Sequence, residues 1–318
     1  MLADFLWAAL GLGLLVLAGD SLVKGAVNLA LRAGIPALVV GLTIVAFGTS
    51  APELLVSVQA VLKDAPGIAL GNVVGSNTAN ILLVLGIPAL ISTIRAGQTD
   101  IRRSYTMMLA ASALFIGLCF TGPILRWQAA VLLGGLALML FDNYLHTRNH
   151  QAAVANGDAA AAEVEGADPS MPGWRIAVYL VLGLIGLPIG ADLLVDSSVD
   201  IARAFGVSET VIGLTLVAVG TSLPELATSV IAAFRRHAEM ALGNVIGSNM
   251  FNLLGIVGVA GLVGPLPIPE QLLRADLWVM LAASLVIAPV VYLRWNLGRM
   301  AGFGLTVAYA TYLLFLVL

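Results

Sequence analysis

A long segment of this chain occurs twice, and this repeat limits the possible folds more than any other feature. Residues 41–86 read GLTIVAFGTSAPELLVSVQAVLKDAPGIALGNVVGSNTANILLVLG, and residues 213–258 read GLTLVAVGTSLPELATSVIAAFRRHAEMALGNVIGSNMFNLLGIVG. The copies align without a gap, about half of their positions are identical, and each carries one glutamate, Glu53 or Glu225. Because an internal repeat builds the same structural unit twice, the architecture should consist of two equivalent halves.

The composition is that of a chain that crosses a membrane many times. Apolar residues make up 60% of the sequence and charged residues 10%, whereas a soluble domain carries about 25% charged residues. The net charge of −3 does not favour a nucleic-acid partner, and the single cysteine, Cys119, excludes an internal disulfide. The first segment lacks a basic start and a cleavage site, so it is predicted to be a transmembrane helix and not a removed signal.

Ten segments are long and apolar enough to span a bilayer, which takes about 20 residues. They are residues 4–31, 36–62, 68–94, 104–121, 124–145, 174–203, 208–234, 240–266, 275–292 and 299–317. The long polar stretch 146–173 has no hydrophobic periodicity and is predicted to be a flexible linker. We therefore expect an all-α membrane protein with an N-terminal five-helix repeat (1–145), a cytoplasmic linker (146–173) and a C-terminal five-helix repeat (174–318).

The odd number of spans in each half predicts the topology, because two homologous five-span units must enter the membrane from opposite faces. If the N-terminus lies outside, the inner loops contain Arg32, Arg95, Arg102, Arg103, Arg148, Arg175, Arg235, Arg236, Arg294 and Arg299. The outer loops then contain only Lys63, Arg126, Arg203 and Arg274. Since basic residues concentrate on the cytoplasmic side, both termini are predicted to lie outside.

The two glutamates indicate a cation site. Each follows a proline, Pro52 or Pro224, that interrupts its helix, and broken helices near mid-membrane expose carbonyl oxygens to cations in many transporters. A carboxylate at the bilayer centre costs about 2.5–3.5 kcal/mol, and two carboxylates brought together repel unless a cation lies between them. Calcium takes six to eight oxygen ligands, whereas the lack of nearby imidazoles and thiols disfavours zinc and copper.

Polar residues recur at helical spacing in the second part of each copy. Serines and asparagines expected to face the glutamates are Ser76, Asn80, Ser248 and Asn252. Asparagines expected to pack and hydrogen-bond against the broken helices are Asn72, Asn77, Asn244 and Asn249. Upstream, Asp20 and Asp192 occupy equivalent positions and are expected to be structural, with Lys24 able to pair with Asp20 along one helical face.

The pairs GTSAPE with GNVVGSNTAN and GTSLPE with GNVIGSNMFN resemble the two alpha-repeats of the calcium/cation antiporter superfamily, specifically the prokaryotic sodium/calcium exchangers. The resemblance implies ten helices, both termini outside, four adjacent cation sites, and helices 4–31 and 174–203 as a sliding pair. It implies calcium ligands at Glu53, Glu225, Thr49 and Thr221. It implies an outer sodium site at Ala218, Thr221, Ser222, Glu225 and Ser248, an inner one at Ala46, Thr49, Ser50, Glu53 and Ser76, and a middle site flanked by Asn80 and Asn252.

The expected function is a secondary antiporter that exchanges sodium for calcium by alternating access, without a cofactor. Family members can carry aspartate at the position of Asn252, so the asparagine here argues against proton or potassium coupling through that position. Cation/proton or potassium-coupled exchange on the same fold remains the alternative, and a passive cation channel is an alternative of another class. An intramembrane hydrolase would need a nucleophile with a base or a metal with His ligands, and no histidine falls within an expected span. We expect a monomer in a prokaryotic inner membrane.

Overall fold

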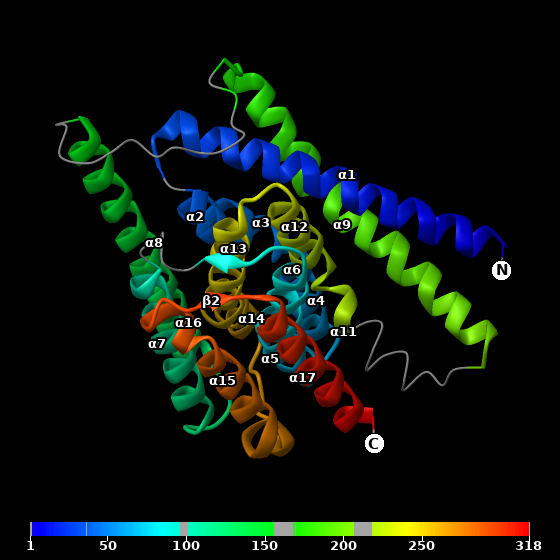
Figure 1. Cartoon of the computed structure of the whole chain (residues 1–318). Coiled ribbons are helices and arrows are strands. Elements are labelled where there is room, and N and C mark those ends of the chain that lie inside the picture. Colours follow the sequence, from blue (N-terminus) through cyan, green and yellow to red (C-terminus); the bar gives the residue numbers. More distant parts are fainter. Residues whose placement is uncertain are drawn as a thin grey trace.

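The computed structural model describes residues 2–35, 37–95, 101–155, 168, 170–206 and 218–317, and almost all of these are helical (Figure 1). The first half contains α1 (Leu2–Ala33), α2 (Ala37–Val40), η1 (Gly41–Val45), α3 (Ala46–Thr49), α4 (Ala51–Leu62), α5 (Pro66–Ala79), η2 (Asn80–Val84), α6 (Gly86–Ile91), β1 (Ile94–Arg95), α7 (Arg102–Cys119) and α8 (Arg126–Ala155). The second half contains α9 (Gly173–Ala204), α11 (Ala218–Gly220), α12 (Leu223–Phe234), α13 (Ala238–Met250), η5 (Phe251–Ile256), α14 (Val257–Val263), η6 (Leu272–Asp276), α15 (Leu277–Val286), α16 (Ala288–Tyr292), β2 (Asn296–Leu297) and α17 (Arg299–Val317). The η segments are π-helical.

These elements form ten membrane-crossing units at the ten expected places, arranged as two inverted five-helix repeats. Seven described helices are individually long and apolar enough to cross a membrane, and the bent pair Leu38–Thr49 with Ala51–Leu62 adds an eighth. The two-residue strand β1 follows the third span of the first half, β2 follows the fourth span of the second half, and the two strands pair in antiparallel fashion. The bridge between Ile124 and Leu266 joins the corresponding connections of the opposite halves. The predicted fold class is therefore confirmed.

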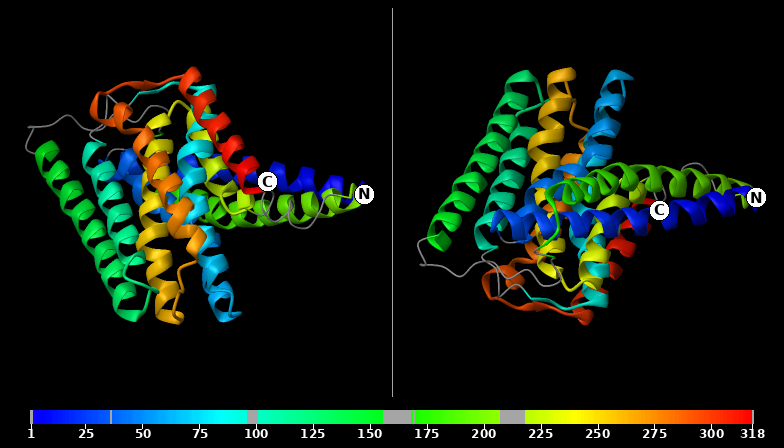
Figure 2. Two further views of the ribbon diagram at one scale, coloured as in Figure 1. Left: turned by 90° about the horizontal axis from the view of Figure 1, so that it is seen from below. Right: turned by 90° about the horizontal axis from the view of Figure 1, so that it is seen from above.

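The longest helices, α1 and α9, lie side by side and cross one face of the bundle (Figures 1 and 2). Both end at equivalent glycines in the left-handed region, Gly34 with φ 63° and Gly206 with φ 77°. Glycine adopts this conformation without steric cost, which is why it commonly ends helices. The most apolar windows of α1 and α9 are only 22% and 28% buried, so most of the surface of this pair faces the membrane.

The second and seventh spans are broken near their centres. In the first half, α3 ends at Thr49 and α4 begins at Ala51, with a bend of 40° at Ser50. In the second half, the break between α11 and α12 lies at Thr221 and Ser222. Pro52 and Pro224 lie in the first turn of the new helices, where the missing N–H of proline costs nothing. The predicted helix breaks are confirmed.

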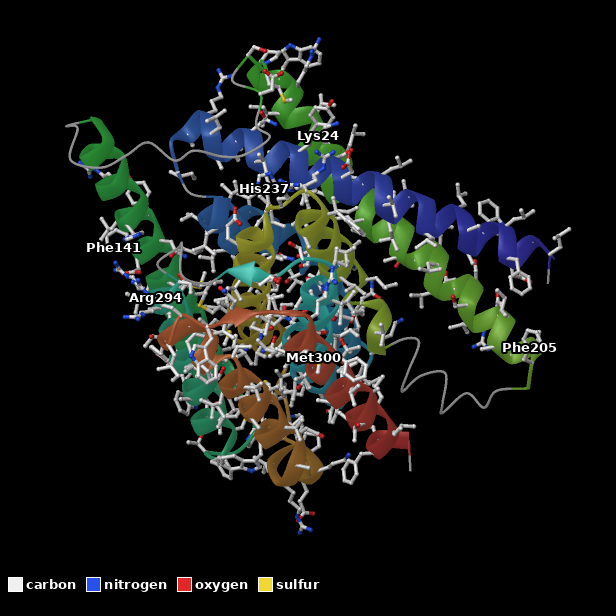
Figure 3. The ribbon with its side chains drawn as sticks, viewed as in Figure 1. Lys24, Phe141, Phe205, His237, Arg294 and Met300 are labelled. Carbon is white, nitrogen blue, oxygen red and sulfur yellow. The ribbon has the colours of Figure 1, made fainter. Side chains whose placement is uncertain are left out.

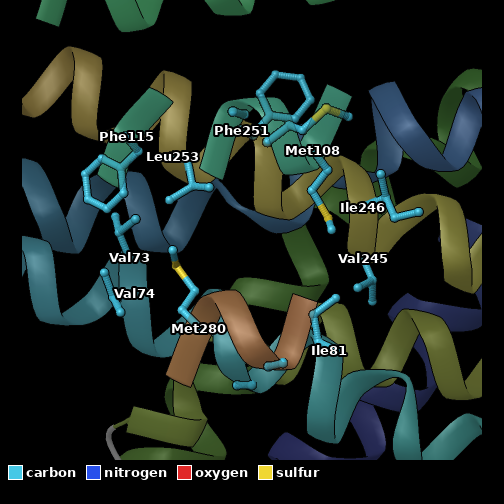
Figure 4. Packing of buried hydrophobic residues seen from close by; sticks show 14 of the residues in the cluster. Val73, Val74, Ile81, Met108, Phe115, Val245, Ile246, Phe251, Leu253 and Met280 are labelled. Atoms are coloured by element: carbon cyan, nitrogen blue, oxygen red, sulfur yellow. The ribbon is translucent and has the colours of Figure 1, made fainter. Parts of the chain in front are cut away.

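The centre of the molecule is formed by the spans α5–η2–α6 and α13–η5–α14, whose most apolar windows are 72% and 89% buried. Each changes from α-helix to π-helix halfway, at Asn80 and at Phe251. Buried aliphatic, methionine and phenylalanine side chains from both halves pack around them, as Figure 4 shows for Val73, Met108, Val245, Phe251 and Met280 among others. π-helical segments often occur at functional sites, and these two carry the polar stripes of the repeat.

The expected linker differs from the structure at its start. Helix α8 continues to Ala155, because the sequence beyond Leu145 includes Gln151, Ala152 and Ala153, which are good helix formers. Residues 146–155 are therefore helical and not a flexible chain. The remainder of the expected linker up to residue 167, and the first ten residues of the expected span 208–234, lie outside the described residues.

Candidate cation site

The two repeat glutamates lie at the centre of the bundle. Glu53 is in the first turn of α4 and Glu225 is in the first turn of α12, and both side chains are fully buried. The break that directly precedes Glu53 is in contact with Glu225. Ser50 Oγ donates a hydrogen bond to Glu225 Oε1 at 3.2 Å, which joins the break of one half to the carboxylate of the other. Helix N-termini favour negative charge, but this effect cannot neutralise two buried carboxylates.

Unpaired oxygens are concentrated on the elements that surround the two glutamates. Both carboxylate oxygens of Glu53 and Oε2 of Glu225 have no hydrogen-bond partner within the described part of the chain. The same is true of the side-chain oxygens of Ser76, Ser222, Ser248, Asn80 and Asn252. A buried polar group without a partner costs about 1–3 kcal/mol, and a bound cation would satisfy several of these oxygens at once. Oxygen atoms alone suit sodium and calcium, and no group of three or more His, Cys, Asp or Glu side chains is found among the described residues.

The threonines and the first asparagine of each stripe connect the halves symmetrically. Thr49 Oγ1 donates to Asn244 Oδ1, and Thr221 Oγ1 donates to Asn72 Oδ1, both at 3.3 Å. Asn72 Nδ2 also donates to the backbone oxygen of Glu53 at 3.2 Å. Asn72 and Asn244 therefore hold the broken helices in place, as expected, while each threonine oxygen keeps lone pairs for a cation.

Two serines support this arrangement and were not predicted from the sequence. Asn72 Nδ2 donates to Ser57 Oγ at 3.0 Å, and Asn244 Nδ2 donates to Ser229 Oγ at 3.4 Å. Both serines are fully buried. Each lies one helical turn after a repeat glutamate and is identical in the two copies. That spacing places each serine on the glutamate's face of the helix, and it is the signal that could have identified them.

Asn77 and Asn249 differ from their expected role. They were expected to contact the broken helices, but their amides bond to each other's backbone and to Asn80 and Asn252. The reason is geometric, because α5 and α13 approach each other directly through these residues. The structure thus brings Asn80 and Asn252 together through a four-asparagine cluster, defined as Asn77, Asn80, Asn249 and Asn252.

The two alanines of the expected sodium sites contribute only backbone. Ala46 is buried in α3, and its carbonyl accepts the N–H of Ser50 at 3.0 Å and the hydroxyl of Thr49 at 3.4 Å. Ala218 begins α11 directly before the second break. Both alanines thus lie on the short helices that lead into the breaks.

Asp20 and Asp192 lie outside this cluster of oxygens. Lys24 lies 3.9 Å from Asp20, which agrees with the expected local pair. Asp20 also forms an ion pair with Arg235, at the end of α12. Lys24 on α1 and His237, just after the end of α12, mark the two sides of this contact in Figure 3. Asp20 is therefore structural, and it attaches α1 to the helix that carries Glu225.

Comparison with known proteins places this architecture in a family. The model of the family described as "Sodium/calcium exchanger protein" matches residues 4–145 and 175–318. The chain is 35% identical over 349 aligned residues to sodium/calcium exchanger MaX1 of Methanosarcina acetivorans, covering 98% of each chain. It is 38% identical over 288 residues to the putative antiporter CaxA of Alkalimonas amylolytica, covering 90% of this chain and 89% of the relative.

A solved structure agrees with the same assignment. The fold is similar to that of the sodium–calcium exchanger NCX_Mj soaked with Na⁺ and Sr²⁺, with a TM-score of 0.82 and 33% identity, covering 98% of this chain and 97% of the other. The relatives are membrane transporters and not enzymes. Together with the ten-helix inverted repeat, these matches show that the chain is an integral, multi-pass cation antiporter that belongs to the sodium/calcium exchanger family.

Proposed function

We propose that this protein exchanges sodium for calcium across the membrane by alternating access, using one cation pocket built from both repeats. One observation carries the proposal: two fully buried carboxylates from opposite repeats are linked through Ser50, and oxygen atoms on the same and neighbouring helices have no hydrogen-bond partner among the described residues. Ion exchange needs no catalytic group and no cofactor, because a pocket of oxygen ligands can bind and release cations by itself.

The residues divide into overlapping ligand sets. Calcium is held by Glu53, Glu225, Thr49 and Thr221. Sodium is held at an outer position by Ala218, Thr221, Ser222, Glu225 and Ser248, and at an inner position by Ala46, Thr49, Ser50, Glu53 and Ser76. Asn80 and Asn252 flank the middle position. The geometry supports these sets, because hydrogen bonds join the break of each repeat to a polar group of the other repeat, from Ser50 to Glu225, from Thr49 to Asn244 and from Thr221 to Asn72.

The coupling of the two ions follows from electrostatics. Because the glutamates are shared, one calcium ion or several sodium ions can neutralise the pocket, but not both at once. A pocket with two uncompensated carboxylates would have to move buried charge between its inward- and outward-facing states, which is costly. Only the loaded pocket changes sides, so the sodium gradient drives calcium in the opposite direction.

The setting of this activity is also proposed. The protein works as a monomer in a prokaryotic inner membrane, with both termini outside, repeats at 1–145 and 174–318, and the connection 146–173 in the cytoplasm. The excess of arginine in the assigned inner loops supports this orientation.

The decisive experiment is calcium uptake into proteoliposomes loaded with sodium. We expect uptake that depends on an outward sodium gradient and stops when sodium is replaced by choline. Uptake driven by a pH gradient without sodium would identify a cation/proton antiporter instead. Calcium current without any counter-ion would identify a channel, and either result would overturn the proposal.

A further inference from the structure

The four-asparagine cluster lies where the two central spans meet. Asn77 and Asn80 come from α5 and η2, and Asn249 and Asn252 come from α13 and η5. All four side chains are at most 1% exposed. An asparagine amide can present either its carbonyl oxygen or its NH2 group to a neighbouring pocket. Which group Asn80 and Asn252 present decides whether the middle of the site attracts or repels cations.

The backbone determines the orientation of the first pair of amides. Asn77 Nδ2 donates to the backbone oxygen of Asn249 at 3.4 Å, and Asn249 Nδ2 donates to the backbone oxygen of Asn77 at 3.3 Å. A backbone carbonyl can only accept a hydrogen bond, so the NH2 group of each amide must face it. The Oδ1 atoms of Asn77 and Asn249 therefore point in the other direction.

The first pair then determines the orientation of the second. Asn80 Nδ2 donates to Asn249 Oδ1 at 3.0 Å, and Asn252 Nδ2 donates to Asn77 Oδ1 at 3.1 Å. Because Oδ1 can only accept, each second amide must turn its NH2 group away from the pocket. The Oδ1 atoms of Asn80 and Asn252 remain, and they have no partner within the described residues.

We infer that Asn77 and Asn249 are positioning residues that force Asn80 and Asn252 to offer carbonyl oxygens, and never NH2 groups, to the cation at the middle position. This inference rests on the proposed exchange function and deepens it. The middle position is thereby a neutral acceptor site, in which two amide dipoles stabilise a cation and the negative charge comes only from Glu53 and Glu225.

Substitution of a positioning residue should change cation binding through the asparagine that it orients. In Asn249→Leu, Asn80 Nδ2 loses its acceptor and can turn towards the unpaired carboxylate oxygens, where it competes with the cation. We expect the apparent KM for calcium or sodium to rise by about tenfold, the value of one hydrogen bond to a charged group, while the maximal rate changes by less than about twofold.

A double-mutant cycle separates positioning from structural support. If Asn249 acts through Asn80, the double variant Asn249→Leu/Asn80→Leu should have the same KM as Asn80→Leu alone. Asn80→Asp places a carboxylate oxygen against the acceptor Asn249 Oδ1, so Asn249→Leu should relieve this repulsion and lower the KM in an Asn80→Asp background, the opposite of its effect in the wild type. The symmetric pair, Asn77→Leu with Asn252→Leu or Asn252→Asp, repeats the test if Asn249→Leu does not fold.

The control is Thr78→Val, which removes a buried hydroxyl that donates to the backbone oxygen of Val74 in its own helix at 3.0 Å. Its KM should equal that of the wild type in the same proteoliposome assay. Additive effects within each cycle, or a lower maximal rate at unchanged KM, would overturn the positioning role. A wild-type protein that shows no sodium-dependent calcium uptake would instead overturn the proposed function, so the two failures are distinguishable.

Discussion

In the first repeat, the break residue Ser50 bonds to Glu225 of the opposite repeat, whereas the equivalent hydroxyl of the second repeat, Ser222, has no partner among the described residues. The periphery shows the same contrast. Asp20 pairs with Arg235, but the equivalent residues Asp192 and Lys63 form no ion pair in the described part of the chain.

The asparagines behave differently, because every inter-repeat bond of the four-asparagine cluster has its symmetric counterpart. The two halves are thus equal where α5 and α13 meet, and unequal at the break serines and at the contact of α1 with α12. If the two repeats exchange conformations during transport, as proposed, the bonds made by one copy only are those that would exchange. The symmetric asparagine cluster would then stay constant, and the break serines and the contact of α1 would change.

Substitution of either repeat glutamate should have the largest effect on transport, and the two effects should be equal because both carboxylates belong to one pocket. Glu53→Gln and Glu225→Gln should each reduce sodium-driven calcium uptake by more than about 100-fold, because loss of one buried charge partner costs about 3 kcal/mol or more. Glu270→Gln, at an exposed carboxylate, is the matched control and should retain full uptake. If uptake persisted after substitution of one glutamate, the proposal of a shared pocket would be wrong.

The break serines should differ from each other. Ser50→Ala removes a hydrogen bond to a carboxylate, so we expect the apparent KM for sodium to rise by about tenfold. Ser222→Ala removes a hydroxyl that has no hydrogen bond to a carboxylate, so it should raise the apparent KM for sodium by about threefold or less. Sodium titrations of uptake measure both values. Equal changes in KM for the two variants would show that the unequal hydrogen bonding of Ser50 and Ser222 does not affect sodium binding.

A smaller difference is expected in stability. Asn72 bonds to Thr221, Ser57 and the backbone of Glu53, whereas Asn244 bonds to Thr49 and Ser229 only. Asn72→Leu should therefore lower the free energy of unfolding by about 1 kcal/mol more than Asn244→Leu. Thermal unfolding of the purified variants in one detergent tests this order, and a reversed order would contradict it.

The smallest effect concerns the ion pair of α1. Asp20 and Arg235 are about one-third exposed, and such pairs contribute at most about 1 kcal/mol. Arg235→Gln removes the ion pair with Asp20 and should lower the population of the conformation seen here. Lys63 is the equivalent of Arg235 and could pair with Asp192 only in the other conformation. Lys63→Gln should therefore slightly raise the population of the conformation seen here. Spin labels at the exposed residues Leu17 and Phe234 would report the distance between α1 and α12. Identical distance distributions in both variants would remove any role of this pair in the conformational balance.

The sequence by itself determined the architecture and the main candidate ligands. The repeat and the apolar segments, each of bilayer length, specify ten spans in two inverted halves, because hydrophobic length is a local property. The helix breaks follow from Pro52 and Pro224, and the site follows from Glu53 and Glu225, since a carboxylate in an apolar segment is rare. Even the structural role of Asn72 and Asn244 could be predicted from this pattern.

Only the tertiary structure decided which polar groups meet. Asn77 and Asn80 lie on a different span from Asn249 and Asn252, and helical periodicity places each on a face without saying what that face contacts. The direction of an amide, oxygen or NH2 towards the pocket, depends on its partner across the interface, here a backbone carbonyl of the other repeat. The same limit applies to Ser50, because the partner of its hydroxyl belongs to the opposite repeat, and the two identical motifs make that contact unequally.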